Sequence, residues 1–519
     1  MLFNSYVFIL LFLPITVAGY YLIARLPDAR APVLWLIIAS LFFYGWWNPA
    51  YLGLISASIV VNYLFGNWIQ RSSSALPMAL GVIFNLGLLI FYKYTNFLVD
   101  NLNLLADTDI HIRTIVLPLA ISFFTFQQIS YLVDTHKGYV KEHSFSNYCL
   151  FVTFFPQLIA GPIVHHSDML PQFADTARRN TIARNIVIGL SIFAVGLFKK
   201  VVIADHMALH ATPVFSAADS GQSMSMLEAW SGVLAYTLQI YFDFSGYSDM
   251  AIGLARMFGI QLPLNFDSPY KSANIIDFWR RWHMTLSRFL RDYIYIPLGG
   301  NRNGPTRRYV NLMTVMLVGG MWHGAGWNFL IWGALHGGYL VINHGWNFCK
   351  TKLLPERALN SVIYYLLSVA TTFVAVMFAW VFFRAETNAG ALLLINNMTD
   401  FSALVLPTSL ESLSAGLNSV FNIFGSSVSF SNATPFMPAT DMAMALLLAL
   451  IASWALPNTQ QLFIDFEPTV ESSGNRVVPH QFRFLRWTMN PLSAVVIAAA
   501  FLYSISQMTG ISEFLYFQF

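Results

Sequence analysis

Long apolar runs separated by short polar connections dominate the chain. A transmembrane helix needs about 20 predominantly apolar residues to cross roughly 30 Å of hydrocarbon, and many of the runs approach that length. They lie at residues 5–24, 32–46, 51–70, 77–94, 114–134, 183–203, 226–243, 309–321, 327–343, 362–383, 441–456 and 491–508. The pattern predicts an all-α polytopic membrane protein with roughly a dozen transmembrane helices.

The composition agrees with this pattern. Of 519 residues, 56% are hydrophobic and only 10% are charged, whereas a soluble domain carries about a quarter charged residues. The first run has no basic segment before it and is too long for a signal peptide, so we expect a retained first span. A net charge of +3 gives no reason to expect a nucleic-acid partner. Membrane lipid is the expected environment.

The positions of Lys and Arg predict an orientation. Basic residues follow alternate spans, whereas the connections at 46–50 and 97–112 contain none. These basic residues are Arg25, Arg30, Arg71, Lys137 and Lys141. Because Lys and Arg are enriched in cytoplasmic loops, we expect the N-terminus outside the cytoplasm and the basic segment 277–308 inside.

Two segments do not fit simple spans. Residues 154–162, FPQLIAGP with a preceding Phe, contain Pro156, Gly161 and Pro162 in a run too short to cross and return. We expect a re-entrant segment buried in protein, because irregular backbone at membrane depth needs polar partners there. Residues 385–440 are rich in Ser, Thr and Asn, which predicts a long surface loop with short helices.

Residues 277–295, DFWRRWHMTLSRFLRDYIY, form two faces when wound as one helix. Asp277, Arg280, Arg288 and Arg291 share a stripe with Arg281 at its border. Phe278, Trp279, Trp282, Leu286, Phe289 and Tyr293 lie opposite. This pattern is typical of an interfacial amphipathic helix. Its arginines either anchor the helix at lipid phosphates or bind an anionic donor substrate.

Several histidines lie in otherwise apolar sequence. His283 lies between the two faces of that helix, and His323, His336 and His344 follow within 317–346. Ionisable groups at membrane depth are costly and often functional, although hydrogen bonds between helices are an alternative explanation. An unbroken helix would separate His323 from His336 by about 20 Å. The two would then not form one pair unless the Gly-rich stretch after His323 breaks the helix.

Other polar groups suggest structural roles. Asp243 and Asp249 lie at the end of an apolar run, where an unpaired carboxylate is expensive, so we expect them to pair with Arg256 or with arginines of 277–291. His165 and His166 are adjacent and have no nearby partner in sequence, which is weak support for a metal site. Cys149 and Cys349 match no metal spacing. We therefore expect no metal and no permanently bound cofactor.

Five motifs in this order resemble the bacterial branch of the membrane-bound O-acyltransferases, and in particular the alginate O-acetyltransferases. They are FVTFFPQLIAGP, LQIYFDFSGYSDMAIGLARMFG, FWRRWHMTLSRFLRDYIYIPLGGNR, MWHGAGWNFLIWGALHG and VFFRAE. The resemblance covers residues 1–385 and weakens over 386–519. We expect one membrane-embedded domain over 1–519, with 1–385 as its catalytic core.

The resemblance implies helices around a central tunnel in the bacterial inner membrane. It implies acetyl-CoA as the donor from the cytoplasm, a polysaccharide acceptor outside, and a periplasmic acetyltransferase or acceptor protein as partner. It assigns catalysis to His323 of the Trp-His-Gly motif and to His283 of the Arg-Trp-His motif. His336 is a third site residue with a less defined role.

These residue types suit acyl transfer. A neutral imidazole can take the proton of an attacking hydroxyl, and His323 is the expected base. His283, Trp327 or Asn328 can supply a donor for the oxyanion, and Arg280, Arg288 and Arg291 can bind donor phosphates. A transporter is the main alternative, because buried His and Asp also line ion paths. Acylation of a protein, a lipid or another glycan is a further alternative.

Overall fold

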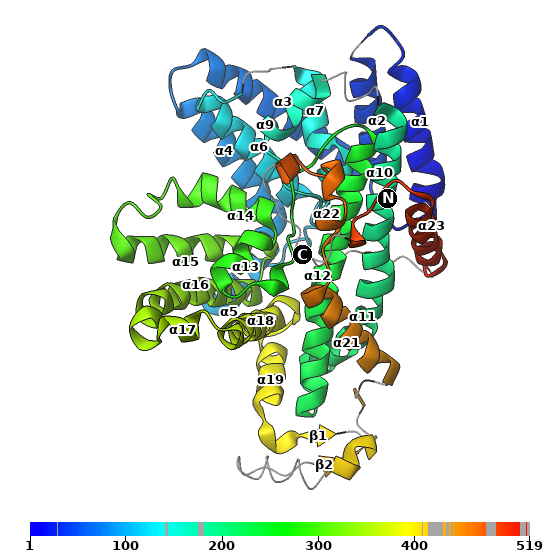
Figure 1. Cartoon of the computed structure of the whole chain (residues 1–519). Helices are drawn as coiled ribbons and strands as arrows, with labels where there is room; N and C mark the ends of the chain where they lie inside the picture. Colours follow the sequence, from blue (N-terminus) through cyan, green and yellow to red (C-terminus); the bar gives the residue numbers. More distant parts are fainter. Residues whose placement is uncertain are drawn as a thin grey trace.

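Helices make up nearly all the regular structure of the computed structural model. The model describes residues 1–28, 30–140, 144–174, 181–406, 408–413, 429–431, 435–436, 438, 440–473, 484–508 and 515. Within these residues only two short strands occur, β1 (Val405–Leu406) and β2 (Ser429–Phe430), which pair in parallel. Figure 1 shows the helices coloured along the chain, from blue at the N-terminus to red at the C-terminus.

The elements of the N-terminal part are η1 (Phe8–Phe12), α1 (Leu13–Ile23), α2 (Ala31–Gly45), α3 (Ala50–Arg71), α4 (Leu76–Leu89), η2 (Ile90–Tyr94), α5 (Thr95–Ala106), α6 (Ile121–His136), α7 (Phe145–Thr153), α8 (Phe155–Leu158) and α9 (His166–Ala174). The middle part holds α10 (Ile182–Phe198), η4 (Lys199–Ala204), α11 (Asp205–Asp219), α12 (Met226–Met257), η5 (Pro269–Lys271), α13 (Ile275–Arg281), α14 (Met284–Leu290), η6 (Arg291–Tyr295), α15 (Gly304–His323) and α16 (Trp327–Leu353). The C-terminal part holds α17 (Glu356–Leu359), α18 (Val362–Arg384), α19 (Asn388–Thr399), η7 (Phe401–Ala403), η8 (Thr408–Leu413), α21 (Thr440–Ala455), α22 (Thr459–Leu462), η10 (Ile464–Phe466), η11 (Val470–Ser473) and α23 (Pro491–Ser506).

Every predicted apolar run overlaps one of these helices, which confirms an all-α membrane fold. In the described chain, four helical stretches are long and apolar enough to cross a membrane: Ala50–Arg71, Leu76–Ala106, Ile182–Asp219 and Val362–Arg384. Shorter apolar helices cover Phe8–Ile23, Ala31–Gly45, Thr440–Ala455 and Pro491–Ser506. The run at 114–134 becomes helical only at Ile121. The total number of spans stays a prediction.

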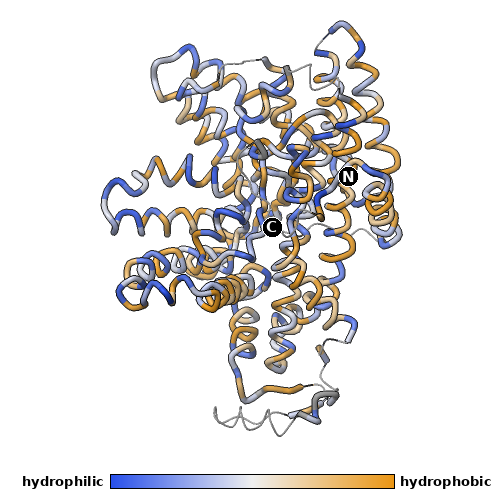
Figure 2. The backbone as a smooth tube through the Cα atoms, viewed as in Figure 1, coloured by the Kyte–Doolittle hydropathy of each residue, from blue (hydrophilic) through white to orange (hydrophobic). Residues whose placement is uncertain are grey.

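Large apolar side chains point outward from these helices. Leu10, Leu22, Val362 and Ile363 are 61–72% exposed, and Figure 2 shows hydrophobic residues along the helices α1, α2 and α10. Contiguous exposed apolar surface marks a membrane or partner-binding region rather than a water-facing one. The outer surface is therefore built for lipid.

Glycines allow α10 and α12 to pack with their backbones in close contact near the middle of the molecule (Figure 1). A Cβ atom placed on Gly253 would lie 2.5 Å from the carbonyl oxygen of Gly189. One placed on Gly196 would lie 2.6 Å from the carbonyl oxygen of Gly246. Small residues at helix contacts are a common device in membranes, where dispersion and hydrogen bonds drive association.

Ion pairs connect the same two regions. Lys200 Nζ lies 2.6 Å from Asp243 and 2.8 Å from Asp205, and Lys199 Nζ lies 2.6 Å from Asp249. The lysines stand side by side on η4 and face α12. The expectation that arginines pair with Asp243 and Asp249 is wrong, because η4 brings these lysines closer. Asp249 also accepts hydrogen bonds from Thr459 and Gln460 of α22.

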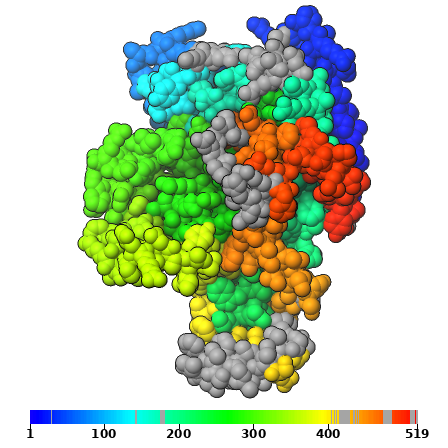
Figure 3. All heavy atoms as spheres, in the orientation of Figure 1, coloured from blue at the N-terminus to red at the C-terminus, as the bar shows by residue number. Residues whose placement is uncertain are grey.

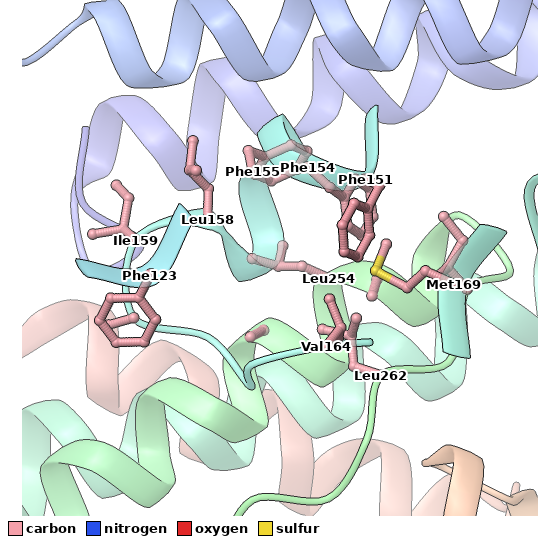
Figure 4. Close-up of a cluster of buried hydrophobic side chains, with 14 of the residues drawn as sticks. Phe123, Phe151, Phe154, Phe155, Leu158, Ile159, Val164, Met169, Leu254 and Leu262 are labelled. Atoms are coloured by element: carbon pink, nitrogen blue, oxygen red, sulfur yellow. The ribbon is translucent and has the colours of Figure 1, made fainter. Parts of the chain in front are cut away.

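The segment 154–162 is buried along its whole length. Its short helix α8 contributes Phe155 and Leu158 to an apolar cluster that includes Leu254 of α12 (Figure 4). The nearby backbone N–H of Ile163 donates to Thr285 Oγ1 at 3.0 Å. The prediction that this irregular backbone is enclosed by protein is confirmed.

The sequence predicts a surface loop with short helices over 385–440; its start is instead a packed helix, and residues 407, 414–428, 432–434, 437 and 439 lie outside the described residues. Residues Asn388–Thr399 form α19, which packs against α11 and α12 and buries Ala391 and Leu394. Its N-cap Thr387 bonds Asp219 at the end of α11. In Figure 3 α19 lies beside the lower end of the molecule, where the body narrows. The polar composition suggested a loop, but one apolar face sufficed for a packed helix.

The close contact between α10 and α12 gives a stability prediction. Gly253→Ala should lower the free energy of unfolding by about 1–3 kcal/mol, because the new methyl group overlaps backbone atoms that cannot move independently. Gly87→Ala is the matched control, because a Cβ there meets no atom within 4 Å. Thermal unfolding of both purified variants in the same detergent measures the difference. Equal melting temperatures would contradict the packing argument.

Candidate functional site

The helix that carries His323 ends at that residue. Residues Gly324 and Gly326 are extended, with φ of −159° and −167°, and α16 begins at Trp327 and runs back along α15. Gly333 permits this close return, because a Cβ there would lie 2.5 Å from the carbonyl oxygen of Met316. The separation of about 20 Å between His323 and His336 on a straight helix therefore does not apply.

A second interruption positions His283. The predicted amphipathic helix over 277–295 is wrong as one element, because it divides into α13, α14 and η6. His283 adopts a left-handed backbone conformation, with φ of 42° and ψ of 53°. Such a conformation is uncommon for residues other than glycine and persists where the surroundings enforce it. The turn directs a fully buried imidazole toward α15.

Asn265 holds this turn. Its side-chain oxygen lies 3.1 Å from His283 Nδ1 and 2.9 Å from the hydroxyl of Thr285, and its carbonyl accepts the N–H of Met284 at 2.9 Å. The amide nitrogen of Asn265 donates to Ser248 at 3.1 Å. Since the Asn265 oxygen is an acceptor, the proton of neutral His283 lies on Nδ1 and the lone pair on Nε2. Burial lowers the pKa of His283, which keeps the ring neutral.

The two interruptions bring His283 and His323 together. Their ring centroids are 6.4 Å apart, and both side chains are buried. The His323 ring has aromatic neighbours on three sides: Trp322, Trp332 and Phe383, each with its centroid 5.0 Å away. The pair therefore lies in an apolar enclosure made by α13, α14, α15, α16 and α18.

His336 is connected to this pair through Trp332. The Trp332 ring lies 5.0 Å from His323 and 4.8 Å from His336, and Trp279 of α13 lies 5.1 Å from His336. Among the described residues, the indole nitrogens of Trp279 and Trp332 and both ring nitrogens of His336 are buried without a hydrogen-bond partner. Buried polar groups are nearly always paired. These atoms are available to a ligand.

Trp327 and Asn328 contact other residues than His323, Trp332 and His336. Trp327 is 54% exposed and its indole donates to Asn101 of α5 at 2.9 Å. Asn328 is buried and its amide donates to the carbonyl of Ala385 at 2.6 Å. Trp327 therefore binds another helix, whereas Asn328 joins the start of α16 to the end of α18. The Asn328 side-chain oxygen has no partner in the described structure.

The arginines have different surroundings. Arg288 pairs with Asp168 of α9 at 2.9 Å, Arg291 with the adjacent Asp292 at 2.7 Å, and Arg281 with Asp277 at 3.0 Å. Arg280 is exposed at the surface of α13. Since the helix is broken at His283, these side chains form no single stripe.

His165 and His166 belong to a different polar cluster. His166 Nδ1 lies 3.3 Å from Asp134 of α6, and the Tyr293 hydroxyl donates to Asp134 at 2.7 Å and lies 3.3 Å from His165 Nδ1. Over the part of the chain that the structure describes, no group of three or more His, Cys, Asp or Glu is arranged to hold a metal ion. The cluster links α6, α9 and η6.

A cavity of about 640 Å³ lies against α16, the helix that carries His336. It is bounded by α16 and α18 and by residues 273–275 before and at the start of α13, and its walls include Asn274, Tyr339, Asn343, Lys350 and Thr372. Tyr339 also contacts His336, with ring centroids 5.8 Å apart. This volume falls within the range of small-molecule sites.

Sequence reasoning missed several of these residues. Asn265 lies 18 positions before His283 and carries no motif signal. Trp332 is part of the motif MWHGAGWNFLIWGALHG, but the motif assigned it no role. It lies between His323 and His336 only because the helix breaks after His323. Lys93 donates to the carbonyl oxygen of His323 at 3.0 Å. As a lone cation in an apolar run, it is the missed residue that the cost of charge at membrane depth could have indicated.

Comparison with known proteins finds O-acyltransferases. A model of the membrane-bound O-acyltransferase family matches residues 137–383. The peptidoglycan O-acetyltransferase of Helicobacter pylori is 40% identical, over 100% of this chain and 98% of its own length. Probable alginate O-acetylases of Azotobacter vinelandii and Pseudomonas aeruginosa are 42% and 41% identical, each over 74% of this chain and over 75% and 72% of their own lengths. With this similarity and the motifs around His283 and His323, the chain belongs to the membrane-bound O-acyltransferase family and is an O-acyltransferase.

Proposed function

We propose that the protein transfers an acetyl group from cytoplasmic acetyl-CoA to a polysaccharide outside the cytoplasm, with His323 as the catalytic base. The observation that supports this most is the buried pair of His283 and His323, 6.4 Å apart, built by two separate helix interruptions. A transporter needs no such pair of imidazoles enclosed by aromatic rings. The relatives are named for acyl transfer, which also favours an enzyme.

The chemistry uses neutral imidazoles. The acceptor hydroxyl attacks the thioester carbonyl carbon while His323 takes the hydroxyl proton. The tetrahedral intermediate then collapses, the carbon–sulfur bond breaks, and the protonated His323 returns the proton to the leaving thiolate. The products are the acetyl ester and the CoA thiol.

Neutral His283, with its proton directed to Asn265, presents a lone pair at Nε2. It therefore serves as a hydrogen-bond acceptor that orients the acceptor hydroxyl, rather than as an oxyanion donor. The indole N–H of Trp332, which lies between His323 and His336, is the better oxyanion donor because it is buried and has no described partner.

The donor approaches through the cavity between α16 and α18. Amide and hydroxyl groups of Asn343, Asn274 and Thr372 in its walls suit the amides of a pantetheine arm. Lys350 in the cavity wall and the exposed Arg280 of α13 are cations suited to the phosphates. Arg288 and Arg291 already have carboxylate partners, so their contribution is secondary.

The relatives support the identity of the acceptor, and the distribution of Lys and Arg supports the side of the membrane on which it lies. The orientation predicted from Lys and Arg places 277–308 and the donor cavity at the cytoplasm and the N-terminus outside. The peptidoglycan enzyme of H. pylori matches the whole chain, whereas the alginate relatives match three quarters of it. A cell-wall glycan is thus the first candidate and an alginate-like exopolysaccharide the second. A periplasmic acetyltransferase completes delivery to the polymer.

The first test is removal of the base. His323→Ala should lower acetylation by at least about 100-fold, because an unassisted hydroxyl is a poor nucleophile. His283→Ala should be nearly as severe, and His336→Ala should retain partial activity because it acts through Trp332. Ester-linked acetate in the host's polysaccharide is measured together with folded protein in the membrane. Near-normal acetate with folded His323→Ala protein would refute the assignment.

The proposed donor site predicts different effects for changes at Arg280 and Arg288. Arg280→Gln should raise the KM for acetyl-CoA by about 10-fold at unchanged protein level, because it removes one charge-assisted phosphate contact. Arg288→Gln is the comparison, because it leaves Asp168 without its partner and should lower stability more than it changes KM. Kinetics in inverted membrane vesicles and thermal unfolding separate the two. An unchanged KM for Arg280→Gln supports the lipid-anchoring explanation instead.

The acceptor is identified by deletion of the gene and complementation. Loss of base-labile acetate from isolated muropeptides, restored by the wild-type protein and not by His323→Ala, identifies peptidoglycan. Loss confined to secreted polymer identifies the exopolysaccharide. Retention of acetate in both fractions would contradict the proposed polysaccharide acceptor.

A further inference from the structure

A buried lysine contacts the end of the helix that carries His323. Lys93 belongs to η2, the wide turn between α4 and α5, and is only 8% exposed. Its Nζ donates to the carbonyl oxygen of Trp322, to that of His323 at 3.0 Å, and to the hydroxyl of Ser122 of α6 at 3.4 Å. A single ammonium group therefore joins three elements at the residue proposed as the base.

Each of the last four carbonyl groups of α15 accepts a hydrogen bond. The last carbonyls of a helix have no partner within it. The carbonyl of Gly320 accepts the N–H of Gly324 at 3.4 Å, and the next one, of Met321, accepts the hydroxyl of Tyr94. Lys93 takes the remaining two. The neighbouring residues Lys93 and Tyr94 of η2 thus allow α15 to end inside the protein.

The partners of the Lys93 ammonium are neutral oxygen atoms at a helix end and one hydroxyl. A lysine ammonium has three donors and no acceptor, and Lys93 meets three oxygen atoms. In the described structure none of these belongs to a carboxylate. The negative end of a helix dipole stabilises a cation placed at the last turn. The C-terminus of α15 thus offers Lys93 a partial negative charge in place of a carboxylate.

We propose that Lys93 is a positioning residue for acyl transfer, whose ammonium fixes the helix end at His323 and places a cationic group beside the imidazole before substrate binds. This inference rests on the proposed function of His323. The titratable groups that face His323 among the described residues are Lys93 of η2, His283 between α13 and α14, and His336 of α16. Of these groups, Lys93 is the one that can place positive charge beside His323 while the histidines are neutral.

Two consequences separate this role from simple helix capping. Loss of the hydrogen bonds displaces His323, and a displacement of about 1 Å can cost roughly 100-fold in rate. Loss of the positive charge makes the imidazolium form easier to reach, because a nearby like charge disfavours protonation. The acidic limb of the rate–pH profile should then move to higher pH.

The experiment uses inverted membrane vesicles from the host, with radiolabelled acetyl-CoA supplied at the cytoplasmic face and label counted in polymer. Lys93→Met should lower kcat by about 100-fold with KM for acetyl-CoA changed less than about 3-fold. Its acidic limb should move upward by about one pH unit. Lys93→Arg should recover part of kcat and the wild-type pH profile, because it keeps the charge.

Tyr94→Phe is the matched control, because it removes a neutral hydrogen bond from the adjacent carbonyl of the same helix end. It should lower kcat less and leave the pH profile unshifted. Ser122→Asp covers the case in which Lys93→Met does not fold. It retains Lys93 and neutralises the ammonium, so the acidic limb should move upward with a small loss of kcat.

Three outcomes would overturn the inference: normal kcat and pH profile in folded Lys93→Met protein, a shift in Tyr94→Phe equal to that in Lys93→Met, or no shift in Ser122→Asp. In each case a strong effect of His323→Ala leaves the proposed function intact. Full activity of His323→Ala would instead remove the proposed function itself.

Discussion

Backbone groups at the ends of helices need partners, and in an apolar interior only the protein can supply them. This constraint governs both interruptions at the site. The helix α15 can end at His323 because Lys93 and Tyr94 donate hydrogen bonds to its last carbonyl oxygens. The N–H of Gly324 donates to the carbonyl before them. The turn at His283 persists because Asn265 bonds its ring, its neighbour's N–H and Thr285.

These two interruptions produce the chemistry. A continuous helix would place His323 and His336 far apart and would turn His283 along an amphipathic face. The breaks instead direct three imidazoles and the ring of Trp332 toward one enclosure. Water is largely excluded there, which favours neutral histidines and strengthens any hydrogen bond to a developing charge.

Other buried charged groups also have partners supplied by neighbouring helices. Lys199 and Lys200 meet Asp249 and Asp243 at the contact between η4 and α12, and Asp134 meets His166 and Tyr293 between α6, α9 and η6. Such pairs hold helices in register, since breaking one leaves an uncompensated charge in an apolar setting.

The sequence alone determined the class of the protein. Apolar runs predicted the helices because helix length must match the thickness of a bilayer, and the motifs around His283 and His323 indicated the family. It also predicted the enclosed segment 154–162, because proline and glycine in an apolar run require protein partners. These properties are local, so they can be read from consecutive residues.

Only the tertiary structure decided which distant residues meet. The partners of Asp243 and Asp249, the link from Asn265 to His283 and the cap that Lys93 places on α15 join positions 18 to 272 residues apart. A helical period assumes that the helix continues, and for 277–295 and the stretch after His323 it does not. Whether a helix ends inside a membrane protein depends on partners from other helices, and a single sequence does not contain that information.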